Sequence, residues 1–424
     1  MDFQQGKGEF SVKIPISIWL YYTYGIIGVL VIALIQTLLY RMAISVYASR
    51  RRSPHFWLAV LLLANIPVAV SLVYYFAGWF GKQPFWVKAY SGLYLSLSLA
   101  FMVYLYAAQG LHRLYVRWRS KPASKPLLRP RTRPDRLQNQ LNRRRFLKKA
   151  VAGFSGMAAF GTFGGIAIAR GMPIIERIEV ALPDLPTNFD GLLIVQLSDF
   201  HAGPFMPREQ LQRIRDMAES LKPDLFVLTG DFADSHPDQV PDFVAALRDL
   251  HAPLGTFSVL GNHDYYADVQ AVEKGLAEAG LSLLRNAHAM IEDGGERIAI
   301  VGLDDRWAPR WGNGRGPNLK QATRGLPPEV FKICLSHQPQ LWPACRKYGM
   351  HLTLSGHTHG GQIGIPNTQI SFARVLSPYV AGLYRHNGQV LYVNRGLGTV
   401  GVPLRIGVPP EITVIRLRKA SVSI

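Results

Sequence analysis

Residues 192–201 read LLIVQLSDFH, a short apolar run that passes directly into an acid and an imidazole. A run of this length, rich in aliphatic side chains and bounded by polar residues, is typical of a buried strand. Five more runs of the same kind follow, over residues 225–229, 257–260, 298–302, 333–336 and 352–354. Helix-period segments lie between them, for example residues 208–221 and 239–250. The alternation predicts an α/β fold with a largely central sheet from about residue 174 onward.

Polar side chains follow five of the six predicted strands. In sheets of this kind, functional sites gather beyond the carboxyl ends of the strands. The side chains at these ends carry a carboxylate, an imidazole or a carboxamide: Asp199, His201, Asp231, Asn262, His263, Asp264, His337, His357 and His359. Each short motif is common alone, but GNHD at 261–264 and GHTHGG at 356–361 add glycines, which allow close backbone approach. The five strand ends in this order form a specific pattern.

A cluster of acids and imidazoles needs a compensating positive charge, because like carboxylates repel and an unpaired buried charge is costly. Divalent cations would remove that cost. Ligands that combine Asp, His and Asn without a thiolate suit Mn, Fe or Zn better than a metal that prefers sulfur. The sequence therefore predicts a site with enough ligands for two divalent metal ions that share a bridging carboxylate.

Over roughly residues 192–417, the chain resembles the calcineurin-like metallophosphoesterase superfamily. Within it, the chain is similar to the bacterial branch that is membrane-anchored or exported by the twin-arginine route. The resemblance rests on the five strand-end motifs, together with Gly-Leu-Tyr at 382–384 and Pro-Glu-Ile-Thr at 410–413. It implies that residues 172–424 form a four-layer α-β-β-α sandwich with a two-metal centre at its rim. It also implies a metal-dependent phosphoric ester hydrolase.

The resemblance further implies a role for each motif residue. The residues that would hold the first metal are Asp199, His201 and His359. The residues that would hold the second metal are Asn262, His337 and His357, with Asp231 as the bridge between the two. His263 matches the catalytic histidine of the family, and Asp264 would orient it.

The net charge is unevenly distributed along the chain. The formal charge of the whole chain is +19. Residues 1–171 hold 23 basic and 3 acidic side chains, whereas residues 172–424 hold 24 basic and 25 acidic side chains. Because the C-terminal part has no basic excess, nucleic-acid binding by this part lacks electrostatic support, and no nucleic-acid partner is expected.

Three stretches of residues 1–111 contain no charged side chain, and each exceeds the roughly 20 residues that cross a bilayer core of about 30 Å. They cover residues 16–40, 56–80 and 89–111, which predicts a membrane domain with three transmembrane helices. Residues 112–149 form a basic linker with fourteen Lys or Arg and one acid, Asp135. By the positive-inside rule, this linker is predicted to be cytoplasmic and the N-terminus to face outward.

The linker ends in RRRFLK at 143–148, which resembles the signal that the twin-arginine export machinery recognises. A fourth apolar segment, residues 150–171, follows this motif directly. This segment is either an export signal or a fourth span flanked by positive charges. Both alternatives place residues 172–424 outside the cytoplasm. The sequence thus predicts a multi-pass protein of the bacterial inner membrane with an extracytoplasmic catalytic domain.

The predicted location limits the substrate class. An enzyme at the outer face of the membrane meets phosphoesters and phosphodiesters of the cell envelope, including lipid-linked ones. One alternative is an enzyme similar to the UDP-diacylglucosamine pyrophosphatases of lipid A synthesis, whose substrate is cytoplasmic. An alternative of another class is a non-catalytic membrane scaffold that uses the phosphoesterase fold to bind a partner. The complete set of ligand residues favours an enzyme.

Three further features leave alternatives open. Arg395 could clamp a substrate phosphate, although a surface ion pair is the favoured interpretation. A Gly/Pro-rich loop with Trp307 and Trp311 could cover the site, or its aromatic rings could simply pack against the domain. Cys334 and Cys345 are expected to be two buried thiols rather than a disulfide or a metal pair.

Overall fold

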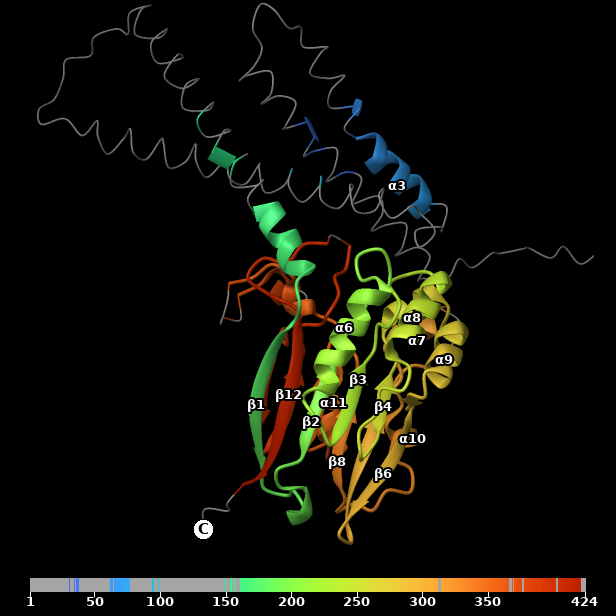
Figure 1. Cartoon of the computed structure of the whole chain (residues 1–424), viewed down its shortest axis with the longest axis vertical. Coiled ribbons are helices and arrows are strands. Elements are labelled where there is room, and N and C mark those ends of the chain that lie inside the picture. The colour runs from blue at the N-terminus through green and yellow to red at the C-terminus, as the bar shows by residue number, and fades with distance from the viewer. Residues whose placement is uncertain are drawn as a thin grey trace, which may run out of the picture. The chain divides into compact units, whose positions relative to one another are not determined.

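The computed structural model divides the chain into two compact units, Met1–Ala158 and Ala159–Ile424 (Figure 1). The residues that the structure describes in the second unit are 161–311, 314–365, 368, 370–375, 377–401 and 403–420. In the first unit it describes single residues and short pieces, of which 65–76 is the longest.

The first unit contains α3, Ile66–Phe76, which carries no charged side chain. Asn65, directly before α3, donates from Nδ2 to Gln36 Oε1 at 3.3 Å and to the Tyr94 hydroxyl at 3.2 Å. These three polar residues come from the three predicted spans. Among the residues described, no helix combines the length and the apolarity that crossing a bilayer requires. Several predicted features lie mostly or wholly outside the described residues: the spans at 16–40, 56–80 and 89–111, the linker 112–149 and its RRRFLK motif.

The first sheet of the second unit has six strands and mixed directions. Their order is β1 (Ile174–Leu182), β12 (Glu411–Lys419), β2 (Leu193–Leu197), β3 (Leu225–Thr229), β4 (Thr256–Val259) and β5 (Ser282–Leu283). The strands from β2 to β5 are parallel, and β12 pairs antiparallel with β2, with Thr413 opposite Gln196. The carboxyl ends of β2, β3 and β4 therefore lie at one edge of this sheet.

The second sheet also has six strands. Their order is β10 (Gly382–His386), β11 (Gln389–Val393), β9 (Leu352–Ser355), β8 (Phe331–Leu335), β7 (Glu296–Gly302) and β6 (Ala287–Asp293). The four central strands are parallel, and the two edge strands are antiparallel to their neighbours. The carboxyl ends of β7, β8 and β9 consequently share one edge.

Apolar side chains point alternately to the two faces of the strands, which explains why the sheets stack. In β3, Leu225 and Val227 belong to the core between the two sheets, whereas Phe226 and Leu228 pack against helices on the other face. This is the period of two that a strand buried on both faces requires. The core between the sheets also takes side chains of the second sheet, such as Ile333.

Helices cover the outer faces of the two sheets. The helices on the first sheet are α6 (Arg208–Glu219), α7 (Val240–Leu247) and α9 (Val269–Glu278). The helices on the second sheet are α10 (Leu319–Ala322) and α11 (Trp342–Lys347). Short connecting helices are α8 (Asn262–Ala267), η2 (Thr187–Phe189), η3 (Pro237–Gln239), η4 (Ala308–Trp311), η5 (Pro339–Leu341), η6 (His359–Gly361) and η7 (Phe372–Val375). The result is a four-layer α-β-β-α arrangement, preceded by a helix over residues 161–169.

The α/β prediction is confirmed, and the six predicted strands all form. The expectation of one largely central sheet was wrong, because β7, β8 and β9 build a second sheet. Strands of both sheets alternate with helices along the chain, so this alternation alone does not reveal which sheet a strand joins. The sandwich that the family resemblance implied is the arrangement that forms.

Candidate metal centre

The candidate ligands lie where strands of both sheets end. Asp199 and His201 follow β2, Asp231 follows β3, and Asn262 begins α8 after β4. From the second sheet, His337 follows β8, and His357 and His359 follow β9. The predicted metal-site residues are therefore brought together from five strand ends.

Five of these residues adopt the left-handed backbone conformation. Their φ angles are 53° for Asp199, 48° for His201, 57° for Asp231, 72° for His357 and 51° for His359. For residues other than glycine, such a conformation costs on the order of 1–3 kcal/mol and persists only where the surroundings enforce it. The turns after the strands are thus held against local preference, and they direct these side chains toward one point.

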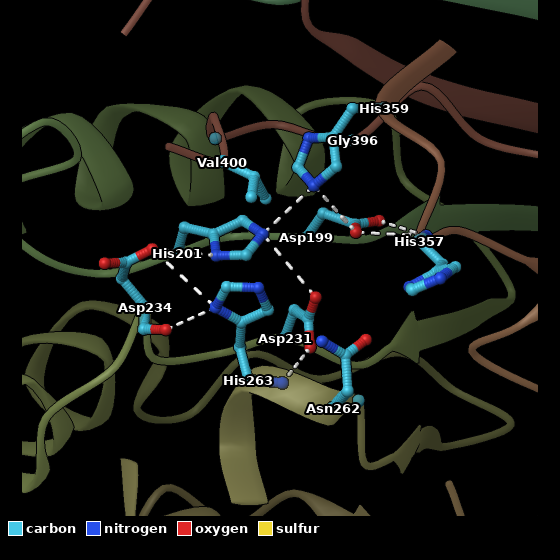
Figure 2. Close-up of polar contacts among 12 residues, drawn as sticks. Asp199, His201, Asp231, Asp234, Asn262, His263, His357, His359, Gly396 and Val400 are labelled. Atoms are coloured by element: carbon cyan, nitrogen blue, oxygen red, sulfur yellow. Dashed lines mark hydrogen bonds and ion pairs between the residues drawn. The ribbon is translucent and has the colours of Figure 1, made fainter. Parts of the chain in front are cut away.

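The first group of donors consists of Asp199, His201, Asp231 and His359, each with one donor atom within 4.8 Å of the others. His201 Nε2 lies 3.1 Å from His359 Nε2 and 3.5 Å from Asp231 Oδ2. His359 Nε2 in turn lies 3.2 Å from Asp199 Oδ1. Figure 2 shows these side chains pointing toward one another.

The second group consists of Asp231, His337 and His357. His337 Nε2 lies 3.1 Å from Asp231 Oδ2 and 3.2 Å from His357 Nδ1. Asp231 Oδ2 therefore faces both groups. Asn262 lies beside them, and its buried Oδ1 has no hydrogen-bond partner among the described residues.

The donor atoms fit divalent cations. Two imidazole nitrogens that face each other at 3.1–3.2 Å, as in both groups, repel when both present lone pairs, unless a proton or a cation lies between them. The unpartnered Asn262 Oδ1 is the kind of buried oxygen that requires a partner. Carboxylate, amide oxygen and imidazole ligands together suit Mn, Fe or Zn.

The electrostatics of the cluster favour added positive charge. Burial lowers the pKa of His337, but the carboxylates of Asp231 and Asp199 outweigh burial and raise this pKa to about 10. Burial raises the pKa of Asp231, yet His337 and His263 hold it well below its usual value. A positive charge beside Asp231 is therefore strongly stabilised, and a divalent cation supplies one.

Hydrogen bonds with the surrounding backbone and with Ser198 orient the candidate ligands. His337 Nδ1 donates to the Thr229 carbonyl at 2.7 Å, which turns Nε2 toward Asp231. The Asp199 carboxylate accepts from Ser198 Oγ at 2.5 Å and from the backbone N–H of His357 at 3.0 Å. Such outer contacts fix the tautomer and the direction of metal ligands.

Two glycines allow the ligands to approach the backbone, as the motif pattern predicted. A Cβ atom on Gly261 would lie 2.1 Å from Asp231 Oδ1. A Cβ atom on Gly356 would lie 2.2 Å from Asp199 Oδ2. No side chain fits at either position without displacing a candidate ligand.

His263 lies next to the first group. Its ring packs edge-on against His201, with ring centroids 4.6 Å apart. Its backbone N–H donates to Asp231 Oδ1 at 2.8 Å, and its Nδ1 donates to the backbone carbonyl of Asp234. Because Nδ1 is engaged in this way, Nε2 is the atom that can exchange a proton with a substrate.

The structure corrects the implied role of Asp264. Its carboxylate accepts the backbone N–H groups of Gly261, Asp231 and Phe232 at 2.8, 3.0 and 2.7 Å. Asp264 is the third residue of α8, so its carboxylate turns back to cap the helix. The residue that contacts the His263 imidazole is Asp234, whose Oδ1 also lies 3.8 Å from Nδ1.

Besides Asp234, sequence reasoning missed three residues around the centre. Asp305 follows β7 and accepts from Gln338 Nε2 at 2.5 Å, and burial raises the pKa of Asp305 to about 6. Applying the same search to the end of β7 would have found Asp305, because acids also follow that strand. Tyr266 accepts a hydrogen bond from Asn262 Nδ2 at 3.0 Å and packs on the ring of His263.

The third missed residue, Arg405, is fully buried. Its Nη2 donates to the carbonyls of Gly396 and Gly398 at 3.0 and 2.5 Å and lies 3.3 Å from His359 Nδ1. Burial lowers its pKa to about 10. The loop that it holds bonds to the centre, since the Gly398 N–H donates to the Asp199 carbonyl at 2.7 Å. A lone arginine in an apolar segment gave no motif to recognise.

The structure decides two of the open alternatives. Arg395 forms ion pairs with Glu411 and Glu176, as the favoured interpretation expected, although Glu411 is fully buried and its pair with Arg395 is therefore not a surface one. Cys334 and Cys345 are buried free thiols with sulfur atoms 3.7 Å apart.

The tryptophan loop is described in part. The guanidinium of Arg310 lies 3.9 Å from the centroid of the Trp307 ring. The side chain of Trp311 and residues 312–313 lie outside the described residues.

Comparisons with known proteins find several similar chains. A family model described as calcineurin-like phosphoesterase matches residues 192–361. The chain is 36% identical over 296 residues to the uncharacterized metallophosphoesterase YkuE of Bacillus subtilis, covering 66% of this chain and 99% of that one. It is 34% identical over 302 residues to a transmembrane protein with metallophosphoesterase domain of Danio rerio, covering 68% of each chain.

Among solved structures, a putative 5'-nucleotidase from Staphylococcus aureus matches with a TM-score of 0.36 and 14% identity. The match covers 50% of this chain and 49% of the nucleotidase.

Proposed function

Since the chain belongs to the calcineurin-like phosphoesterase family and is a metal-dependent phosphoester hydrolase, we propose that it works with two divalent cations at the outer face of a bacterial cytoplasmic membrane. Its proposed substrates are phosphoesters or phosphodiesters of the cell envelope. The uncharged runs at 16–40, 56–80 and 89–111 support membrane anchoring, as does the name of the Danio rerio relative. The resemblance of RRRFLK to a twin-arginine signal supports an extracytoplasmic domain.

The observation that carries the two-ion proposal is the position of Asp231. Its Oδ2 lies 3.5 Å from His201 Nε2 and 3.1 Å from His337 Nε2. The proposed ligands of one ion are Asp199, His201, His359 and Asp231. The proposed ligands of the other are Asn262, His337, His357 and Asp231. When bound, paired divalent cations act as Lewis acids on phosphoryl oxygens and lower the pKa of water.

His263 is the proposed proton donor to the leaving oxygen. The Asp234 carbonyl accepts from Nδ1 and thereby fixes the orientation of the ring. Burial lowers the pKa of His263 relative to its ordinary value, so its imidazolium is a stronger acid than a solvent-exposed one. Protonation of the leaving group by such a residue typically contributes about 10²–10⁴-fold to the rate.

The proposed activity is tested on the purified full chain supplied with Mn²⁺. Phosphomonoesters, phosphodiesters and pyrophosphates are compared as substrates, and bound metal is measured on the same sample. We expect hydrolysis of at least one class. Asp231→Asn should lose both hydrolysis and bound metal, because the shared negative charge is gone. Asp216→Asn, an exposed change on α6, is the control and should lose neither. Full metal occupancy in Asp231→Asn would refute the shared-carboxylate assignment.

The proposed location is tested by reporters fused after residue 424. We expect a fused alkaline phosphatase to be active, and a fused green fluorescent protein to be degraded by protease added to spheroplasts, whether the domain crosses the membrane folded or unfolded. The opposite pattern would place the domain in the cytoplasm and would favour the nucleotide-lipid pyrophosphatase alternative.

A further inference from the structure

Exposed apolar side chains are concentrated on one surface of the second unit. Among the described residues of this unit, eleven large hydrophobic side chains are exposed, and nine of them fall in residues 163–174, 363–375 and at Ile406. The most exposed are Val375 at 84%, Phe163 at 75%, Ile370 at 63% and Ile365 at 54%. Exposed apolar patches of this kind commonly mark interaction sites.

The three segments form one connected surface. A Cβ atom on Gly165 would lie 2.4 Å from Leu404 Cδ1, so the helix over residues 161–169 packs closely on the loop before Ile406. The Arg405 N–H donates to the Gly165 carbonyl at 3.0 Å. The Gly364 N–H donates to the Ile406 carbonyl at 3.0 Å. Figure 1 shows this helix before β1, with the orange and red loops beside it at one end of the sandwich.

The three segments themselves carry cations and no acids, and Glu176, which lines the same cavity as Ile365 and Ile370, is paired with Arg395. No Asp or Glu occurs between His357 and Pro410, or between Asp135 and Glu176. Arg170 and Arg374 are exposed within the same segments. Apolar side chains flanked by cations, with the neighbouring Glu176 paired, match an interface with anionic lipids, where apolar groups enter the acyl boundary and cations meet head groups.

The surface is continuous with the candidate metal centre. His359 begins η6, and the chain passes from η6 through Gln362 directly into Ile363. The Gln362 side chain accepts from the Val400 N–H at 2.5 Å and donates to the Val400 carbonyl at 3.2 Å. Val400, labelled in Figure 2, follows Gly398 by two residues, and the Gly398 N–H donates to the Asp199 carbonyl at 2.7 Å. A surface that rests on a bilayer through these segments would hold the centre at the level of lipid head groups.

We propose that this apolar surface, formed by the described residues of 163–174 and 363–375 and by Ile406, docks on an anionic lipid bilayer and presents the centre to phosphoesters of lipid head groups. The inference rests on the proposed function, because residues 163–171 belong to the apolar segment 150–171, which is proposed as an export signal or a fourth span. It adds a substrate class: phosphoesters that remain in the membrane during hydrolysis.

The docking is tested with a fluorescent label on the full chain, reconstituted into phosphatidylcholine vesicles with and without phosphatidylglycerol. Val375→Cys carries an environment-sensitive fluorophore, and Met290→Cys, on the β6 edge strand, is the matched control. The native Cys334 and Cys345 are fully buried, so they do not compete for the label. We expect a blue shift and quenching by brominated lipid at position 375, strengthened by phosphatidylglycerol, and neither effect at 290.

Two results would overturn the docking proposal. One is water-like emission at position 375, equal to that at 290. The other is a blue shift that brominated lipid does not quench, which would mean that protein, either another part of this chain or a second copy, covers the surface.

A kinetic test addresses the substrate class. Ile365→Ser, Ile370→Ser and Val375→Ser are combined, and Met290→Ser with Tyr348→Ser forms the control. Turnover of vesicle-borne phosphatidic acid is divided by turnover of soluble p-nitrophenyl phosphate. The triple variant should lower this ratio by about tenfold or more, because less apolar area holds the domain at the bilayer. An unchanged ratio refutes the inference. If the proposed function itself is wrong, the unaltered chain will hydrolyse neither substrate, including the soluble one.

Discussion

At the scale of single residues, Asp231 has two roles in the centre. Its carboxylate faces imidazoles from both donor groups, and its Oδ1 also accepts the backbone N–H of His263. The same side chain therefore positions the proposed proton donor relative to the proposed ions. His263 itself contributes no donor atom to either proposed ion, so its substitution separates proton transfer from metal binding.

His263→Ala is expected to keep its metal and to lose turnover by about 10²–10⁴-fold, because proton donation to the leaving oxygen is removed. The loss should grow with the pKa of the leaving alcohol. The measurement is kcat for a series of aryl and alkyl phosphoesters, together with metal content. His386→Ala, an exposed histidine on β10, is the control. Equal losses for good and poor leaving groups would remove His263 from the role of proton donor.

At the scale of elements, the turns after the strands decide the geometry. Gly356 directly follows β9, and the backbone there approaches the Asp199 carboxylate so closely that no Cβ fits. Gly356→Ala is expected to weaken metal binding by about 10–100-fold, the range seen when contacts that orient metal ligands are disturbed. Metal titration by calorimetry measures this. Gly164→Ala is the control, because a Cβ there meets no atom within 4 Å. Unaltered affinity in Gly356→Ala would show that the turn can relax freely.

The strand ends were predictable from sequence, since apolar runs followed by polar residues locate both the strand and its carboxyl end. Asp199, Asp231 and His337 were found in this way. The partition into two sheets was not predictable, because pairing joins residues remote in sequence. Side-chain direction was equally hidden: Asp264 caps α8, and Asp234 contacts His263 instead. The number of residues that separate Asp264 or Asp234 from His263 does not reveal which of the two contacts its ring.

At the scale of the whole catalytic unit, the centre joins the two sheets. Asp199, His201, Asp231 and Asn262 come from the first sheet and its connections, whereas His337, His357 and His359 come from the second. Ions bound by both sets would link the two sheets, and this link would add to the hydrophobic core that lies between them. The buried carboxylates would also lose their mutual repulsion.

Metal removal is therefore expected to lower the free energy of unfolding of this unit. A ligand that binds the native state alone stabilises it by about 2.7 kcal/mol at a concentration of 100 Kd. Thermal unfolding of the full chain, followed by circular dichroism with a chelator and then with added Mn²⁺, measures the difference. Asp231→Asn should show a much smaller Mn²⁺-dependent increase in Tm than the unaltered chain. If both chains gained the same Tm from Mn²⁺, the stabilising ion would bind elsewhere, and the link between the two sheets would have to be assigned to packing alone.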